Sequence, residues 1–180
     1  EIILNNGLTT LNKTNVATLL PVIIPDTTSR VAISDIVAGT TSFRVRGYAL
    51  GSVAPQITLT GDNFAQCTPS APVDNTFDCT FTQVPSRAAR LSMSVNVNGF
   101  QSQSAAQVVE VYPTITPATT TVIGAVGAPL TIKGSGFGNI ASVISVSLSS
   151  GYCDVSSVNP AGDTIICTLV SKPNSGALTA

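Results

Sequence analysis

The stretch Leu130-Thr131-Ile132-Lys133-Gly134-Ser135-Gly136-Phe137-Gly138 decides the fold, because an earlier part of the chain has the same pattern. Residues 43–51 read Phe-Arg-Val-Arg-Gly-Tyr-Ala-Leu-Gly and align with the later stretch at an offset of 87 residues. In both, alternating apolar and polar residues, the pattern of a half-buried strand, lead into a glycine turn. Such self-similarity indicates tandem repeats of one structural unit.

The four cysteines continue the repeat. Cys67 corresponds to Cys153 at an offset of 86, and Cys79 corresponds to Cys167 at an offset of 88. Four cysteines allow three connectivities, and the repeat favours Cys67 with Cys79 and Cys153 with Cys167, because each pair then lies within one unit. The alternative is a four-thiol zinc site, but zinc ribbons have only about two to four residues between close partners. Disulfides would imply an oxidising, extracellular setting.

The remaining pattern predicts an all-β chain. Strands are expected where apolar and polar residues alternate, at 43–47, 56–60, 91–97, 130–133 and 143–148. Turn residues separate them, at 61–63, 69–72, 98–99, 159–163 and 173–176. No segment combines a helical apolar period with a capping signal. A unit of about 90 residues with about seven short strands has the size of an immunoglobulin-like domain, so we expect tandem immunoglobulin-like β-sandwiches.

The start of the chain repeats a later segment. Leu4-Asn5-Asn6-Gly7 parallels Asn96-Val97-Asn98-Gly99 at an offset of 92, and residues 16–20 parallel 106–109 at an offset of 89 to 90. We therefore expect residues 1–29 to be the C-terminal strands of a preceding repeat or a donor segment. Residues 30–112 would form one repeat, and 113–180 a repeat lacking its last strands. Two prolines in residues 112–117 predict a short, fairly stiff junction.

Residues 113–180 contain the entry strand Pro113-Thr114-Ile115-Thr116-Pro117, a strand ending in Gly134-Ser135-Gly136-Phe137, and cysteines in Cys153-Asp154-Val155 and Ile165-Ile166-Cys167. In these motifs and their order, the segment resembles the IPT/TIG family of immunoglobulin-like domains. The first repeat keeps the outer glycines and both cysteines, but has Tyr48-Ala49-Leu50 in place of the Gly-Phe turn. The resemblance implies an IPT/TIG-type sandwich. Such domains occur in cell-surface receptors and adhesion proteins, in secreted carbohydrate enzymes and in DNA-binding transcription factors.

Composition narrows the possible functions. Charged residues make up 9% of the chain and the net charge is -1, so there is no basic footprint for nucleic acid or an anionic membrane. No stretch reaches the roughly 18 consecutive apolar residues of a membrane span. The absence of histidine removes the commonest general base and a common metal ligand. We expect no catalytic residue, no cofactor and no resident metal.

Carbohydrate could be attached at two places. Asn12-Lys13-Thr14 is the single Asn-x-Ser/Thr sequon with a permitted middle residue, so Asn12 is the expected glycosylation acceptor of a secreted protein. The run Thr119-Thr120-Thr121 with its neighbouring prolines suits either O-linked sugar or an exposed strand entrance.

Three further features have a functional and a plainer interpretation. Oxygen-rich residues around the first cysteine loop could bind calcium, or could serve turns and solvation: Asp62, Asn63, Asp74 and Asp78. Gly134 and Gly136 could direct amides at an anion, but without a following helix we interpret them as a backbone device with Phe137 as a plug. Arginines could form a carboxylate-binding patch or a solvated sheet face: Arg44, Arg46, Arg87 and Arg90.

These features together predict a non-enzymatic extracellular or cell-surface protein with a structural or adhesive role. Its sandwiches would stack into a rod. If residues 1–24 completed the repeat at 113–180 of another copy by strand addition, copies would join head to tail into an open filament. The other interpretation is one long continuous array. The alternative function is a recognition receptor, so the expected partners are copies of this chain, or another cell-surface protein or glycan.

Overall fold

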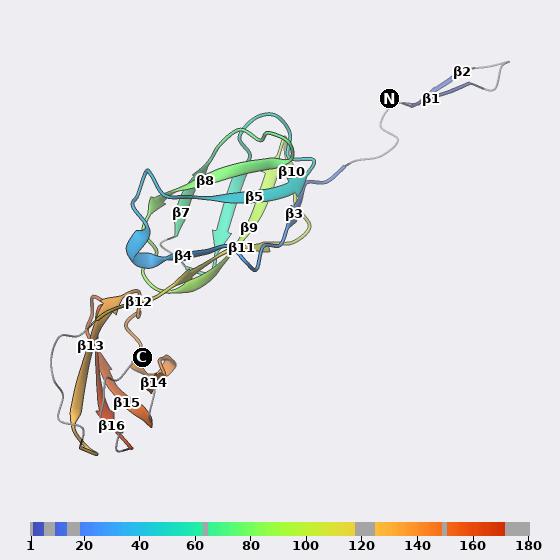
Figure 1. The fold of residues 1–180 in the computed structure, drawn as a ribbon. Coiled ribbons are helices and arrows are strands. Elements are labelled where there is room, and N and C mark those ends of the chain that lie inside the picture. The colour runs from blue at the N-terminus through green and yellow to red at the C-terminus, as the bar shows by residue number, and fades with distance from the viewer. Residues whose placement is uncertain are drawn as a thin grey trace.

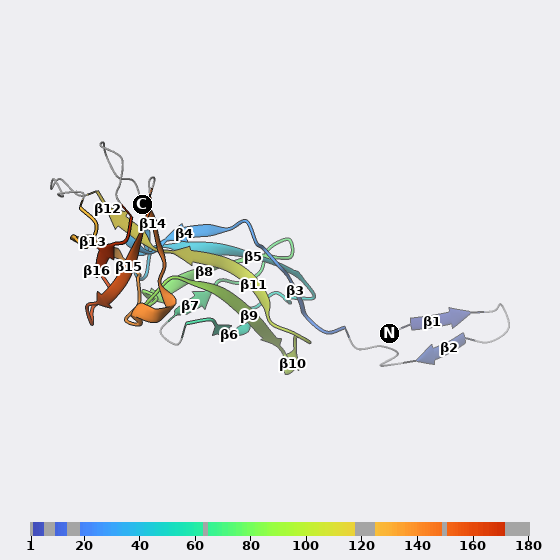
Figure 2. The same ribbon diagram turned by 90° about the horizontal axis from the view of Figure 1, so that it is seen from below.

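The computed structural model describes residues 2–5, 10–13, 19–62, 65–117, 125–148 and 151–171. They form a hairpin of β1 (Ile2–Asn5) and β2 (Thr10–Lys13), followed by module 1 (residues 19–112) and module 2 (residues 113–171). Figures 1 and 2 show the hairpin and module 2 at opposite ends of module 1. The expected immunoglobulin-like all-β fold is confirmed. None of the helices in the described ranges is long and apolar enough to cross a membrane.

Module 1 is a sandwich of two sheets. One has the strand order β3-β5-β8-β7, and the other has the order β10-β9-β11-β4, with β6 paired to β9. The pairs are antiparallel, except that β4 runs parallel to β11. A short 3₁₀ helix, η1 (Ile33–Asp35), follows β4. The strand bounds are β3 Val22–Ile24, β4 Arg30–Ala32, β5 Ser42–Tyr48, β6 Gln56–Thr60, β7 Gln66–Pro69, β8 Thr76–Gln83, β9 Ala89–Val97, β10 Phe100–Gln101 and β11 Ala106–Tyr112.

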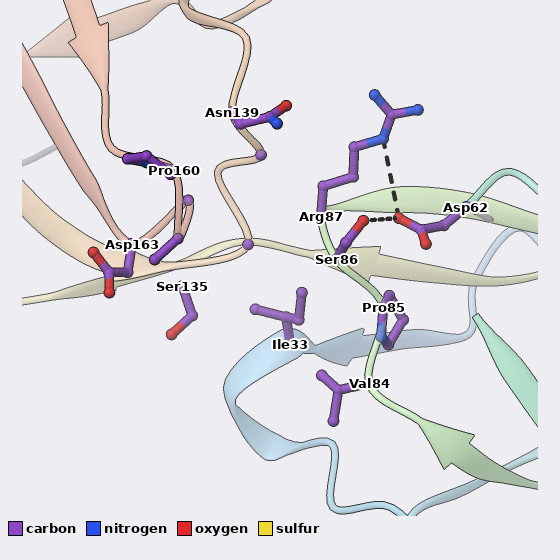
Figure 3. A pocket seen from close by; sticks show the side chains of 14 residues that line it. Ile33, Asp62, Val84, Pro85, Ser86, Arg87, Ser135, Asn139, Pro160 and Asp163 are labelled. Atoms are coloured by element: carbon purple, nitrogen blue, oxygen red, sulfur yellow. Dashed lines mark hydrogen bonds and ion pairs between the residues drawn. The ribbon is translucent and has the colours of Figure 1, made fainter. Parts of the chain in front are cut away.

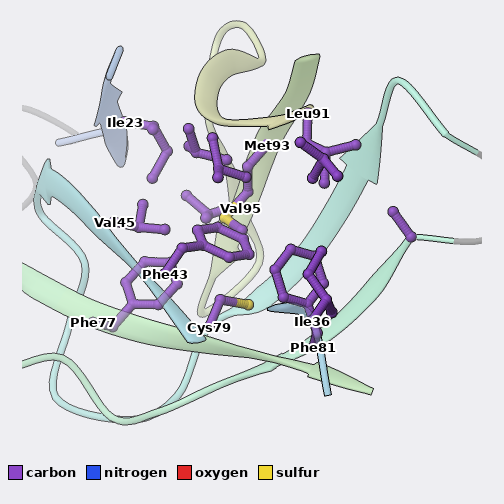
Figure 4. Close-up of a cluster of buried hydrophobic side chains, with 14 of the residues drawn as sticks. Ile23, Ile36, Phe43, Val45, Phe77, Cys79, Phe81, Leu91, Met93 and Val95 are labelled. Atoms are coloured by element: carbon purple, nitrogen blue, oxygen red, sulfur yellow. The ribbon is translucent and has the colours of Figure 1, made fainter. Parts of the chain in front are cut away.

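The core of module 1 lies between its two sheets and contains only residues of module 1 (Figure 4). Alternate residues of β5 point inward, which buries Phe43 and Val45. The ring of Phe43 lies 5.1 Å from that of Phe81 on β8, and Leu91 of β9 faces them from the other sheet. Because each such side chain contributes roughly 1.5–3 kcal/mol when fully buried, this alternation is what fixes the register of the sheets.

Module 2 forms one sheet within the described residues. Its order is β12-β13-β16-β15-β14. The bounds are β12 Thr114–Thr116, β13 Pro129–Ser135, β14 Val146–Leu148, β15 Gly151–Val158 and β16 Thr164–Leu169, with the 3₁₀ helix η2 at Ala141–Val143. Its core residues are buried as well, namely Leu130, Ile132, Cys153, Ile165, Cys167 and Leu169. Among the described residues no strand corresponds to β9, and β14 pairs with β15 instead.

The two modules share their strand register. Phe43 lies opposite Cys79 in module 1, as Leu130 lies opposite Cys167 in module 2. The first strands match too, because Ile23 lies opposite Gly47 as Ile115 lies opposite Gly134. Strand β12 therefore corresponds to β3. The segments around them read Pro-Val-Ile-Ile-Pro at 21–25 and Pro-Thr-Ile-Thr-Pro at 113–117, a match at an offset of 92 that the sequence analysis missed.

Two sequence expectations need correction. The sequence predicts that residues 1–29 belong to a preceding repeat or a donor segment, but β3, within that range, pairs with β5, and Ile23 is buried in the core of module 1. The sandwich therefore includes the strand between Pro21 and Pro25, and does not begin at residue 30. The strand expected at 143–148 is also shorter, because Val143 closes η2 and β14 begins at Val146.

The cysteines form two disulfides, Cys67 with Cys79 and Cys153 with Cys167. The first joins β7 to β8 with Cα atoms 5.5 Å apart, and the second joins β15 to β16 at 5.6 Å. Both distances are ordinary for a disulfide. Each bridge lies within one module, as the repeat favoured.

Replacing Cys67 and Cys79 together by alanine should lower the free energy of unfolding of module 1 by about 3 kcal/mol, because the cross-link restricts the unfolded chain by roughly that amount. Urea unfolding of the variant and of the unmodified chain measures the difference. Peptide mapping without reduction is the control. An unchanged unfolding midpoint, or a cross-link between the modules, would contradict this assignment.

Candidate interaction site at the joint between the modules

The joint is built around the glycine turn of module 2, residues 134–138. The turn is held from within its own module, because the N–H of Gly134 donates to the carbonyl of Asp163 at 2.8 Å. The N–H of Phe137 likewise donates to the carbonyl of Gly162 at 3.0 Å. These two amides are therefore engaged by the β15–β16 loop, so the N–H groups of Gly134 and Phe137 are not available to an anion.

Gly136 makes the direct contact with module 1. Its φ is +78°, and its carbonyl accepts a hydrogen bond of 2.9 Å from the N–H of Ala88. A Cβ atom on Gly136 would lie 2.8 Å from Cγ2 of Ile33, closer than real Cβ atoms approach a neighbour. Ile33 of η1 thus packs on bare backbone, and only glycine suits both the conformation and the contact.

A cleft of about 720 Å³ opens beside this contact, with walls from both modules (Figure 3). On the module 1 side, Asp62 is buried and accepts a hydrogen bond of 2.9 Å from the hydroxyl of Ser86. The Nε of Arg87 lies 4.0 Å from the same carboxylate. Asp62 therefore holds residues 86 and 87 in place, directly before Ala88.

On the module 2 side, Asp163 organises the β15–β16 loop. Its Oδ1 accepts hydrogen bonds from the Thr164 hydroxyl and the Asn159 amide, both at 2.7 Å. These bonds, that of Thr164 first, hold the pKa of Asp163 below its usual range, because they favour the charged carboxylate. The loop places the carbonyl of Gly162 where it accepts the hydrogen bond from the N–H of Phe137.

Some of the charged residues singled out in the sequence form separate acid–base pairs, and neither the acidic residues nor the arginines gather into one cluster. Asp78 pairs with Arg44 on the exposed face of β5 and β8, with Nε and Oδ1 2.9 Å apart, and this hydrogen bond lowers the pKa of Asp78. Asp62 instead contacts Ser86 and Arg87. In the described part of the chain, no group of three or more His, Cys, Asp or Glu residues could hold a metal ion. The structure thus supports neither the calcium loop nor the arginine patch.

Several carbohydrate and ligand positions stay predictions. The backbone of Asn12 belongs to β2, but Thr14 of its sequon lies outside the described residues. Asn63 and the run Thr119-Thr120-Thr121 also lie outside them.

Residues 111–179 match the family model of the IPT/TIG domain. This part of the chain is an IPT/TIG domain. The matched range begins in β11 and contains the glycine turn, both cysteines of module 2 and its side of the joint. IPT/TIG domains are immunoglobulin-like modules for protein–protein interaction. Comparison with curated proteins and with solved structures gave no match.

The IPT/TIG resemblance drawn from the sequence is thereby confirmed for the C-terminal range. Sequence reasoning located the glycine turn of the joint but missed its other half. Ile33 and Ala88 belong to no motif, and the contact uses the amide of Ala88, which any residue except proline would supply. The one available signal was Ile33, a single apolar residue directly after β4, and in the sequence it cannot be distinguished from an ordinary core residue.

The hydrogen bonds to Asp163 predict a pH dependence in module 2. A carboxylate whose folded pKa is depressed adds stability above the unfolded pKa, about 3.9, and loses it as the pH falls through the folded value. Asn159→Ala removes one donor and should raise the pKa of Asp163 toward its usual range. A carbon-detected NMR titration of the carboxyl group measures the shift. An identical titration midpoint in the variant and the unmodified chain would show that the bond is not formed.

Proposed function

We propose that this chain is a non-enzymatic structural or adhesive part of an extracellular protein, in which immunoglobulin-like modules stack into a stiff rod and bind other proteins. The joint carries the proposal. Besides the covalent link at Pro113, the Ala88 to Gly136 hydrogen bond and the packing of Ile33 tie the modules together. A second set of contacts of this kind restricts rotation about the link, which a flexible linker would permit.

Other observations support the proposed extracellular location and the binding of other proteins. Two disulfides fit an oxidising compartment outside the cytosol. The IPT/TIG domain supports action through protein contacts, and a charged fraction of only 9% permits modules to pack closely. Glycosylation at Asn12 would agree with a surface location.

The rod could be a single long array or a filament of separate copies. Intact-mass measurement of natural material, denatured and reduced, distinguishes them, because a chain far above 18.3 kDa would show a continuous array. A recognition receptor for another protein or a glycan is the second candidate. It is favoured by large apolar side chains exposed on the surface of module 1, such as Tyr48 and Phe100.

Gly136→Ala should uncouple the modules. The new Cβ meets Ile33, whereas Gly127→Ala introduces the same group at a similar φ of +84° with nothing within 4 Å. Both variants incur a left-handed backbone cost of about 1–2 kcal/mol in module 2, so only the contact with Ile33 differs. The ¹⁵N relaxation of each module reports its rotational correlation time. We expect one shared value in the unmodified chain and in Gly127→Ala, and two separate values in Gly136→Ala.

Separate correlation times in the unmodified chain would contradict the stiff joint. Equal effects of the two glycine variants would show that backbone strain, and not the contact with Ile33, determines the coupling.

A further inference from the structure

The end of module 1 that faces away from module 2 is built like the end of module 2 that forms the joint. Ala49 corresponds to Gly136, and both have positive φ, at +55° and +78°. Gly51 and Gly138 correspond as well, with φ of +74° and +75°. The turn that module 2 places against Ile33 is thus repeated at the opposite end of module 1.

The neighbouring loop is repeated too. The N–H of Gly47 donates to the carbonyl of Asn75 at 2.9 Å, as that of Gly134 donates to the carbonyl of Asp163 at 2.8 Å. Asp74, at the position of Gly162, has a φ of +49° where Gly162 has +68°. The glycine turn and its hydrogen bond to the neighbouring loop therefore recur in module 1, although the tips of the two loops differ, because Asn75 has a φ of +60° and Asp163 does not have a positive φ.

This surface differs from its counterpart in being more apolar. Ser135 and Ala161 line the cleft at the joint, and the corresponding residues of module 1 are Tyr48 and Val73. Tyr48 is 60% exposed and Val73 is 68% exposed. Two bulky side chains on one exposed end mark a contact surface more strongly than isolated apolar residues would.

A cleft adjoins this surface at the position where an apolar side chain of a partner would pack. Ile33 packs on Gly136 in the joint, and the corresponding Ala49 lines a cleft of about 280 Å³. Leu19 and Phe100 also line it, and they are 80% and 47% exposed.

The partner is suggested by the other end of module 2. Its turn before β13 matches the turn before β5, because Gly127 donates to Leu169 at 2.8 Å as Gly39 donates to Phe81 at 2.7 Å. In this turn Val126 is 62% exposed. The far end of module 2 thus shares this turn with the end of module 1 that carries Ile33, and it presents an apolar side chain at Val126, where module 1 has Ala38.

We propose that residues 48–53 and 73–75, with the adjoining cleft, form a docking surface for the far end of module 2 in a second copy of this chain. The contact would repeat the joint between the modules and would extend head to tail without closing. The proposal builds on the stiff rod proposed above and names the surfaces that would join successive copies. The linker gives the internal joint an effective concentration on the order of millimolar, so a joint that forms under this condition implies a Kd for the same contact between separate copies at or below about that concentration.

Sedimentation velocity of the full chain over a concentration series up to about the millimolar range tests the proposal. Tyr48→Glu should weaken association at least about tenfold, because it puts a charge into an apolar contact. Val126→Lys should do the same from the other side. Val37→Lys is the matched control, since Val37 is 58% exposed at the other end of module 1 and outside the proposed contact.

Sedimentation of an equal mixture of the Tyr48→Glu and Val126→Lys variants is the most stringent test of the proposed contact. Each variant alone should remain monomeric, but together they keep one intact pair of surfaces and should form dimers and nothing larger. A chain that stays monomeric throughout the series would overturn the proposal, as would association that survives both substitutions. The relaxation experiment on the monomer is independent of this outcome, so a failed docking surface is distinguishable from a flexible joint.

Discussion

The close approach of one strand to one glycine organises each module. At Gly47 the carbonyl of Val22 occupies the place of a Cβ atom, and at Gly134 the carbonyl of Thr114 does the same. Only glycine lets the first strand of each module pair so closely with the next. This pairing brings β3 and β12 into their sheets, and so determines where each module begins. The chain must then turn sharply, and that turn supplies the surface from which the joint is made.

The buried carboxylate of Asp62 contributes to the joint through its neighbours. It holds the Ser86 hydroxyl and lies near Arg87, and the next residue, Ala88, donates to Gly136 of module 2. A buried carboxylate is stable only when polar groups compensate its lost hydration. The loop that compensates Asp62 is the loop that reaches module 2. The polar contacts of the buried Asp62 carboxylate in module 1 and the geometry of the joint are therefore linked.

Sequence reasoning succeeded where side chains or glycines carry the structure. The repeated glycine turn and the cysteine spacing gave the fold, because backbone conformation and cross-linking depend on these residue types. It failed at β3, since three residues between Pro21 and Pro25 are too few to show an alternating pattern. It also failed at the joint, where the atoms in contact are the carbonyl of Gly136 and the amide of Ala88. Almost every residue type supplies these backbone groups, so the contact cannot be recognised from the amino-acid sequence.

The turn in module 1 is supported by contacts within its own module. Ala49 holds a φ of +55°, a left-handed conformation that costs a residue with a side chain about 1–2 kcal/mol. The turn is held by the Gly47 to Asn75 hydrogen bond and by Leu50, which is 1% exposed. The matching turn of module 2 has the corresponding hydrogen bond from Gly134 to Asp163 and a further one from Phe137 to Gly162, and it therefore meets Ile33 already shaped. Little backbone freedom remains to be lost in forming the joint, which is the condition under which a small contact can hold two modules in a fixed relation.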